Sequence, residues 1–324
     1  MIDKIKRFNS LKLDWKNFQS NNKKTRIRDA SNILGFSEAE ILSTEINETV
    51  KYLSVDDLDG FFNHMFSIDK LMFLIRSNYV VHEIVVEGKN LYFDSDTIFS
   101  KKNNGQPLLK FNRKLLMFFF YQKKIHSKRE LRSIQIFDKM GSSVIKIYLK
   151  GRDKKEFDKL VSSYVVDYQY QLQGVDFKSH SQSGGINLGS VDFYFRNKKS
   201  TDYIVSNDIV SNINLRIVLN NILKNKISVQ IYALGLDAVQ YFYGQIKNIV
   251  DYGPWINIID KGFNLHVLEK SLTKCVLSKH CNYEKYFYSV DFLDNNGRYL
   301  LGITSTQGKE ESFIQMVNHL KGLK

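Results

Sequence analysis

The chain has 324 residues, of which 43% are hydrophobic and 13% are aromatic. This composition excludes a disordered chain, and the length favours two lobes of about 150 residues each. The formal net charge of +13 favours anionic partners such as phosphates, nucleic acid or the carboxylates of a small ligand.

Export and membrane insertion are not expected. Residues 1–7 carry charges without an apolar segment behind them, and the longest apolar runs, such as 115–121, are shorter than the ~20 residues of a membrane span. The two cysteines, Cys275 and Cys281, are too few for a disulfide framework or a structural zinc site. The sequence therefore predicts a cytoplasmic protein.

The N-terminal part of the chain, 1–70, is predicted to be helical. Ser37-Glu38-Ala39-Glu40 is a capping box, in which the serine side chain binds a free amide and Glu40 reaches back. Together with residues 27–35 it predicts a helix, a glycine-containing turn and a second helix. Such a pair can read DNA, although helices that only pack together are more common.

Positive charge is concentrated in residues 101–155, which hold 16 basic and 3 acidic residues. This window has two interpretations. It is either a solvated strand face or a surface for an anionic partner.

An internal duplication is visible in the second part of each half. Residues 131–149 align without gaps on 287–305, with an offset of 156 in residue number. Each copy predicts an alternating strand, an Asp-x-x-Gly turn, a second strand and a helix. The pairs that coincide are Ser133/Ser289, Asp138/Asp294, Gly141/Gly297, Ile147/Ile303, Phe157/Phe313 and Val161/Val317, and the same offset pairs Gly88 with Gly244 and Leu109 with Leu265.

These patterns predict an α+β fold with two similar lobes, each an antiparallel sheet with a C-terminal helix, preceded by N-terminal helices. The first lobe is predicted to span residues 1–171, with helices over 1–70 and a sheet and helix over 71–171. The polar stretch 172–190 is predicted to be a linker. The second lobe is predicted to span residues 191–324.

Several segments in order resemble the HemS/ChuS-type hemin-degrading factors, a family of bacterial cytoplasmic heme-handling proteins with two similar lobes. The resemblance covers nearly the whole chain. The segments that carry it are residues 28–40, Asn78-Tyr79-Val80-Val81-His82-Glu83, residues 132–138, Gly253-Pro254-Trp255-Ile256-Asn257-Ile258 and residues 263–269.

The resemblance implies that heme binds between a lobe's sheet and a helix. Heme requires an axial iron donor, apolar walls and cations for its two propionates. The family's principal ligand is a histidine just after the linker, where this chain has Ser190-Val191-Asp192-Phe193-Tyr194-Phe195, with Asp192 at the ligand position. Thr304 and Gln307 occupy the positions of the family's tyrosine and arginine on and after the last strand.

By the same resemblance, the first lobe keeps His82 as a candidate ligand of the heme iron and Tyr148 on the hairpin. Lys110 and Arg113 lie in the basic window, where they could pair with propionates. Tyr194 is a candidate phenolate ligand, and His266 is a further candidate for heme binding or an ordinary strand residue. We also expect residues 186–210 to be contracted relative to the family.

We expect a cytoplasmic heme-binding protein of heme and iron utilisation, which either carries imported heme or opens its ring. Its expected partners are heme and a heme-uptake transporter or heme acceptor protein, with a homodimer left open. Two alternatives stay open: a nucleic-acid-binding regulator that uses residues 26–45 and the basic window, and a degenerate relative that acts only as an interaction partner. The motifs of other enzyme classes are absent.

Overall fold

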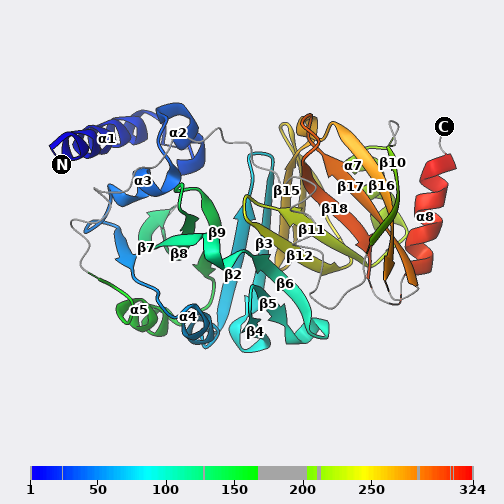
Figure 1. Cartoon of the computed structure of the whole chain (residues 1–324), viewed down its shortest axis with the longest axis horizontal. Coiled ribbons are helices and arrows are strands. Elements are labelled where there is room, and N and C mark those ends of the chain that lie inside the picture. The colour runs from blue at the N-terminus through cyan, green and yellow to red at the C-terminus, as the bar shows by residue number, and fades with distance from the viewer. Residues whose placement is uncertain are drawn as a thin grey trace. The chain divides into compact units, whose positions relative to one another are not determined.

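A computed structural model gives the fold of the chain. It describes residues 2–23, 25–126, 128–166, 203–209, 213–282, 285–306, 308 and 310–322. The predicted linker 172–190, Tyr194 and most of the segment 186–210 lie outside these residues. The described residues form two compact units (Figure 1). Unit 1 contains Met1–Phe73, Glu87–Lys89 and the chain from Asn112, and unit 2 contains Leu74–Val86, Asn90–Phe111 and the C-terminal part of the chain.

Unit 1 begins with helices and continues into an antiparallel sheet with the strand order β1-β7-β8-β9. Its elements are α1 (Ile2–Asn21), α2 (Ile27–Leu34), α3 (Glu38–Ser43), β1 (Val50–Leu53), α4 (Leu58–Met65), η3 (Arg113–Leu115), β7 (Leu116–His126), β8 (Arg129–Asp138), β9 (Ser143–Leu149) and α5 (Lys154–Ser162). β2 (Lys70–Arg76) leads from unit 1 into unit 2.

The predicted capping box is confirmed at the start of α3. The Ser37 hydroxyl accepts a hydrogen bond from the Glu40 amide at 3.1 Å, and Glu40 accepts one from the Ser37 amide at 2.8 Å. Gly35 ends α2 with a φ of 72°, a conformation that favours glycine. The prediction that residues 1–70 are all helical is wrong at β1, because this four-residue strand is fixed by pairing with β7, which no local pattern shows.

Unit 2 contains a nine-stranded antiparallel sheet with the order β10-β16-β17-β18-β11-β12-β6-β5-β4, and a second set of paired strands, β3-β15-β14-β13. Its elements are β3 (Val80–Glu87), β4 (Leu91–Asp94), β5 (Thr97–Ser100), η2 (Lys101–Asn103), β6 (Gln106–Phe111), β10 (Tyr203–Ile209), α7 (Leu215–Lys224), β11 (Val229–Leu234), β12 (Ala238–Gly244), β13 (Ile249–Tyr252), β14 (Trp255–Asp260), β15 (Phe263–Leu268), η5 (Glu269–Ser271), β16 (Lys274–Asn282), β17 (Lys285–Leu293), β18 (Tyr299–Ser305) and α8 (Glu310–Gly322).

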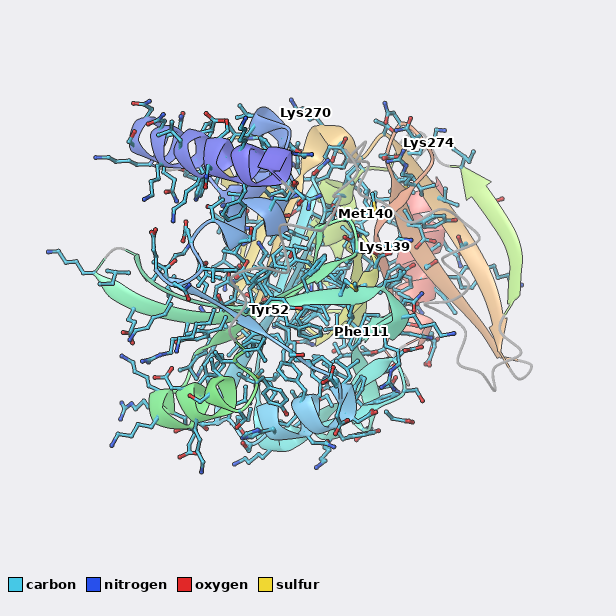
Figure 2. All side chains as sticks on the ribbon, turned by 60° about the vertical axis from the view of Figure 1, so that its left-hand side comes forward. Tyr52, Phe111, Lys139, Met140, Lys270 and Lys274 are labelled. Carbon is cyan, nitrogen blue, oxygen red and sulfur yellow. The ribbon has the colours of Figure 1, made fainter. Side chains whose placement is uncertain are left out.

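The two predicted hairpin turns are equivalent, which confirms the duplication. Gly141 and Gly297 have φ values of 77° and 74°. In each turn the aspartate side chain, of Asp138 or Asp294, accepts two backbone amides at 2.8–2.9 Å. Figure 2 labels Lys139 and Met140 in the first of these turns. The helix after each hairpin also buries two of the predicted pairs, Phe157/Phe313 and Val161/Val317, together with Leu160 in α5 and Met316 in α8.

The repeats exchange three-stranded segments within unit 2. Strands β4, β5 and β6 of the first repeat join β12 of the second, with Leu109 opposite Gln240. Conversely, β13, β14 and β15 join β3, with Leu265 opposite His82. Leu109 and Leu265 thus occupy equivalent positions, and their separation in the sequence equals the predicted offset of 156. His82 and Gln240 also occupy equivalent positions, but their separation is two residues greater than that offset.

This difference of two positions shows that the segment between β3 and β6 is longer in the first repeat. Gly244 therefore corresponds to Val86 and not to Gly88, so the pairing of those two glycines was wrong. None of the helices that the structure describes is long and apolar enough to span a bilayer.

Candidate functional site

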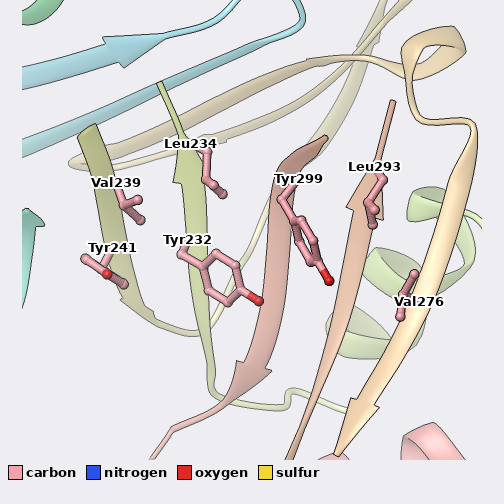
Figure 3. Close-up of a cluster of buried hydrophobic side chains, with 7 residues drawn as sticks. All are labelled: Tyr232, Leu234, Val239, Tyr241, Val276, Leu293 and Tyr299. Carbon is pink, nitrogen blue, oxygen red and sulfur yellow. The ribbon is translucent and has the colours of Figure 1, made fainter. Parts of the chain in front are cut away.

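One face of the nine-stranded sheet in unit 2 gathers tyrosines. We call the tyrosine face the cluster of buried side chains that five neighbouring strands place side by side (Figure 3). Its members are Tyr232, Leu234, Val239, Tyr241, Val276, Leu293 and Tyr299, with the partly buried Tyr243 packed against them. Tyr232 lies opposite Tyr241 in the ladder and Leu234 lies opposite Val239, so the register places their side chains on one face.

A buried carboxylate organises the polar part of this face. Asp291 is 2% exposed and accepts hydrogen bonds from the hydroxyls of Tyr232, Ser278 and Ser289, the latter two at 2.9 and 2.7 Å. Burial, and then the Asp291 charge, raises the pKa of Tyr232 well above its ordinary value and that of Tyr299 to about 12. These phenols are therefore neutral hydrogen-bond donors at neutral pH.

Gly302 on β18 makes room for the Tyr232 ring. A Cβ atom at Gly302 would collide with the ring carbon Cζ, so only glycine allows this close approach. The gapless alignment of the repeats places Lys146 at the equivalent position of unit 1. One repeat thus has a lysine side chain at the position where the other has no side chain.

The equivalent face of unit 1 is filled by the protein's own helices. Ala39 and Leu42 of α3 pack on Phe118, Phe120 and Phe137 of the sheet. Below them, Glu38 accepts hydrogen bonds from Arg28 at 3.0 Å and from Lys146 at 2.9 Å, and all three side chains are buried. Arg28 and Glu38, which lie in the predicted DNA-reading pair, are thus used in packing α2 and α3 within unit 1.

Lys110 adjoins the tyrosine face. It lies opposite Val239 in the β6–β12 ladder, so it shares that face, and its side chain is partly exposed. Tyr243 on β12 is also partly exposed, yet its hydroxyl oxygen is buried and has no hydrogen-bond partner in the part of the chain that the structure describes. Burial raises the pKa of Tyr243 far above its ordinary value.

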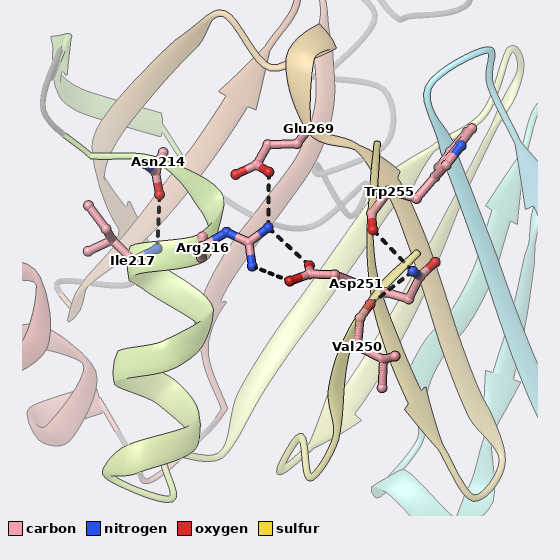
Figure 4. A network of polar contacts seen from close by, with 8 residues as sticks. Asn214, Arg216, Ile217, Val250, Asp251, Trp255 and Glu269 are labelled. Atoms are coloured by element: carbon pink, nitrogen blue, oxygen red, sulfur yellow. Dashed lines mark hydrogen bonds and ion pairs between the residues drawn. The ribbon is translucent and has the colours of Figure 1, made fainter. Parts of the chain in front are cut away.

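Arg113 is engaged in an ion pair within unit 1. Its guanidinium contacts Asp59 of α4 at 3.0 Å. Unit 2 has the same contact with the charges inverted, because Arg216 of α7 binds Glu269 at 3.0 Å and also holds Asp251 through two hydrogen bonds (Figure 4). Arg113 and Glu269 are equivalent at the offset of the repeat. The structure thus gives Arg113 a partner other than a propionate.

His82 occupies the core of unit 2. Its side chain is wholly buried, its ring lies 5.1 Å from that of Phe263, and neither ring nitrogen makes a hydrogen bond of normal geometry among the described residues. Burial lowers the pKa of His82 to about 3, and the side chain of Gln240, its equivalent in the second repeat, opposes this shift. Iron binding by His82 stays a prediction, and it requires that the sheet open around the ring.

The remaining candidates are spread over both units. Tyr148 is partly exposed on β9 of unit 1, opposite Ser133. His266 is partly exposed on β15 of unit 2, where its Nδ1 lies 2.7 Å from the Asn257 amide oxygen. Tyr194 lies outside the described residues. Among the described candidates, His82, Lys110 and His266 thus belong to unit 2, and Arg113 and Tyr148 belong to unit 1.

Ion pairs neutralise part of the basic window. Besides Arg113 and Lys146, Arg132 binds Glu130 at 2.9 Å and Asp158 at 3.0 Å, and Lys123 binds Glu130 at 3.2 Å. This pattern is that of a solvated strand face with structural pairs. The residues described hold no group of three or more His, Cys, Asp or Glu side chains that could bind a metal ion.

The tyrosine face itself was not predicted. The alternation of Gln240-Tyr241-Phe242-Tyr243 shows that Tyr241 and Tyr243 share a face of their strand. Only the ladder shows that Tyr232 and Lys110 share it, because the strands that carry them are neighbours through the exchange between repeats.

A family model described as the Haemin-degrading HemS.ChuX domain matches residues 35–164 and 207–320. Among solved structures, the heme degrading enzyme ChuS from Escherichia coli O157:H7 is similar, with a TM-score of 0.79, 17% identity and coverage of 96% of this chain and 98% of that chain. Holo-PhuS, a heme-binding protein from Pseudomonas aeruginosa, has a TM-score of 0.79 at 14% identity, with 95% and 97% covered.

A search of curated proteins found no match to this chain. At these identities the two solved structures support the fold, while the family model covers about three quarters of the sequence and both of its repeats. This chain therefore belongs to the family of the haemin-degrading HemS/ChuX domain.

Proposed function

We propose that this protein binds heme and acts in heme utilisation. The observation that carries the proposal is the family match in both repeats. The fold supports it, because it follows those of a heme degrading enzyme and a heme-binding protein over nearly their full lengths.

The tyrosine face is our preferred site for the porphyrin. Its buried aliphatic and aromatic side chains supply an apolar wall, and Lys110 on the same face supplies a cation for one propionate. Arg113 contacts Asp59 within unit 1. In unit 1 the helix α3 packs on the equivalent face.

Tyr243 is our preferred iron donor among the described residues. Its hydroxyl oxygen is buried without a hydrogen-bond partner there, and such an orphaned group is costly unless a ligand completes it. A tyrosine is a known type of haem donor. Since burial raises the pKa of this phenol, the ferric ion must displace its proton, and binding should weaken as the pH falls.

We propose carriage of heme in the cytoplasm as the basic activity, with a heme-uptake transporter or a heme acceptor protein as partner. Carriage needs affinity alone. Ring opening needs, in addition, an open coordination position and polar groups that steer activated oxygen. On the same face, Tyr232 is a polar group of this kind, and its hydroxyl donates a hydrogen bond to Asp291.

An absorption titration with hemin tests the proposal. We expect a Soret shift that saturates, and a basic protein of similar charge serves as the control for nonspecific binding. Tyr243→Phe should change the ligand bands and weaken affinity, whereas Tyr92→Phe, at a 38% exposed position on β4, should change neither. A titration that matches the basic control rejects heme binding. Addition of ascorbate in air then separates carriage from ring opening by loss of the Soret band and release of iron.

A further inference from the structure

The β7–β8 hairpin of unit 1 extends past its neighbouring strands. β1 pairs with β7 up to Gln122, and β9 pairs with β8 from Ser133 onward. β7 and β8 continue to pair with each other as far as His126 and its partner. We call residues 123–125 and 128–132 the hairpin end. It belongs to the basic window, and the function proposed above does not use it.

The hairpin end carries positive charge that the protein leaves without a counter-charge. It contains five basic residues and one acidic residue, Glu130. Glu130 already binds Lys123 at 3.2 Å and Arg132 at 2.9 Å. It also binds Lys154 of α5 at 3.3 Å. Three further cations of the hairpin end are exposed and make no ion pair with the residues that the structure describes, namely Lys124, Lys128 and Arg129. This excess favours an anionic partner.

The register distributes the cations over both faces of the hairpin. Lys123 and Ile125 lie on one face of β7, and Lys124 lies on the other. Arg129 is two positions from Leu131, the partner of Lys124, so it shares the face of Lys124. When a hairpin approaches a planar anionic surface end-on, cations on both of its faces meet that surface together.

Ile125 places an aliphatic side chain among these cations. It is 80% exposed. Exposure of this side chain to water is unfavourable, and its transfer to the boundary between lipid headgroups and acyl chains is favourable. Proteins that bind single-stranded nucleic acid use aromatic side chains for stacking, and the hairpin end has no aromatic residue. An aliphatic side chain surrounded by cations therefore favours an anionic lipid surface.

From this combination we propose that the hairpin end is a membrane-contact site for bilayers that contain anionic lipids. Lys124, Lys128 and Arg129 bind the headgroup phosphates, and Ile125 enters the layer just below them. One aliphatic side chain and a few cations give weak, reversible binding at the surface of the bilayer. The proposal concerns a different site from that of heme and does not depend on heme binding.

The test is sedimentation of the full chain, without hemin, with vesicles of phosphatidylglycerol and phosphatidylcholine. We expect binding that weakens as the salt concentration rises, and much weaker binding to phosphatidylcholine alone. The double variant Lys124→Gln and Arg129→Gln should weaken binding by about 25-fold, at about fivefold for each cation removed. The matched control replaces Lys270 and Lys274, two exposed lysines of unit 2 labelled in Figure 2, by glutamine and should leave binding intact.

Two single variants examine the other parts of the contact. Ile125→Ser should weaken vesicle binding by about tenfold. Ile209→Ser, at a 75% exposed position on β10 of unit 2, is its matched control and should not weaken it. Lys128 has a φ of 66°, which glycine adopts without strain, so Lys128→Gly removes a cation and leaves the turn intact. This variant should weaken vesicle binding by about fivefold.

The outcomes separate this proposal from the others. Membrane contact is rejected if the unaltered protein does not sediment with the anionic vesicles, or if the control variants weaken binding as much as the hairpin variants. If Ile125→Ser binds as tightly as the unaltered protein, the preference for lipid over another anionic partner is rejected. If the hairpin variants weaken binding to duplex DNA and leave vesicle binding unchanged, the cations serve nucleic acid and the proposal also fails. Since no hemin is present, heme binding stands or fails separately in the absorption titration.

Discussion

The equivalent sheet faces of the two repeats carry different polar side chains. In unit 1 the face lies under α2 and α3 and encloses the Arg28–Glu38–Lys146 ion network. In unit 2 the equivalent strands carry tyrosines around Asp291, and Gly302 stands where unit 1 has Lys146. The duplication has therefore preserved backbone geometry while the polar chemistry has diverged, so a family motif in one repeat does not predict the role of its counterpart in the other.

The largest effect is expected from the buried network of unit 1. Glu38→Gln removes the carboxylate that both Arg28 and Lys146 contact, and breaking a buried ion pair in this way costs about 3–5 kcal/mol. Urea unfolding should show this loss. Lys146→Met, which leaves Arg28 paired with Glu38, should cost less. Equal losses of stability in the two variants would mean that Glu38 does not pair with both Arg28 and Lys146.

The close approach at Gly302 provides the next largest effect. Gly302→Ala must displace the Tyr232 ring and its hydrogen bond to Asp291, and overpacking of this kind costs about 1–3 kcal/mol. In a Tyr232→Leu background the same substitution should cost less, because the ring is gone. A cost that is the same in both backgrounds, measured by urea unfolding, contradicts the contact.

His82 should make stability fall in acid. Its pKa is about 3 in the folded protein and about 6.5 in the unfolded chain, so the unfolded chain binds a proton first as the pH falls. The contribution of the neutral His82 ring to the free energy of unfolding is complete above pH 6.5 and is lost toward pH 3. Between pH 7 and 5 the free energy of unfolding should fall by about 1–2 kcal/mol from this cause. His82→Gln, which copies Gln240, should remove this component, and His319→Gln should not. If the free energy of unfolding fell with pH as steeply in His82→Gln as in the unaltered protein, the His82 ring would be solvated in the folded state.

The inverted ion pair gives the smallest effect. Asp59 is 55% exposed and Arg113 37%, so Asp59→Arg or Arg113→Asp should each cost about 0.2–1 kcal/mol. The double variant recreates the Arg216–Glu269 arrangement of unit 2 and should recover most of the loss at low salt. Additive losses in the double variant would indicate that the pair does not interact.

Local features of the fold were predictable from sequence because they depend on neighbouring residues. The capping box at Ser37 and the turns at Asp138 and Asp294 are examples, since their hydrogen bonds close within a few positions. The exchange of strands was not predictable, because alternation shows that a segment is a strand and not which strand it joins.

The same reason explains why the environments of the candidate site residues were not predictable. The sequence pattern offered His82 as a strand histidine, but β3 is buried on both faces where it meets β15, so the ring has no access to solvent. Arg113 was predicted to be available, while its partner Asp59 is 54 residues away in the chain. His266 stays a candidate, and its contact with Asn257 lies across the ladder, which only the register shows.

The exchanged strands also impose an order on biosynthesis. When the ribosome has released β6, the partner of Phe111 is Ala238, which is still more than a hundred residues from being made. Leu265, the ladder partner of His82, is synthesised later still. During translation the first repeat therefore carries unpaired strand edges, which are templates for association with other chains. A nascent chain of this protein should need protection, by a chaperone or by speed of synthesis, until the second repeat emerges.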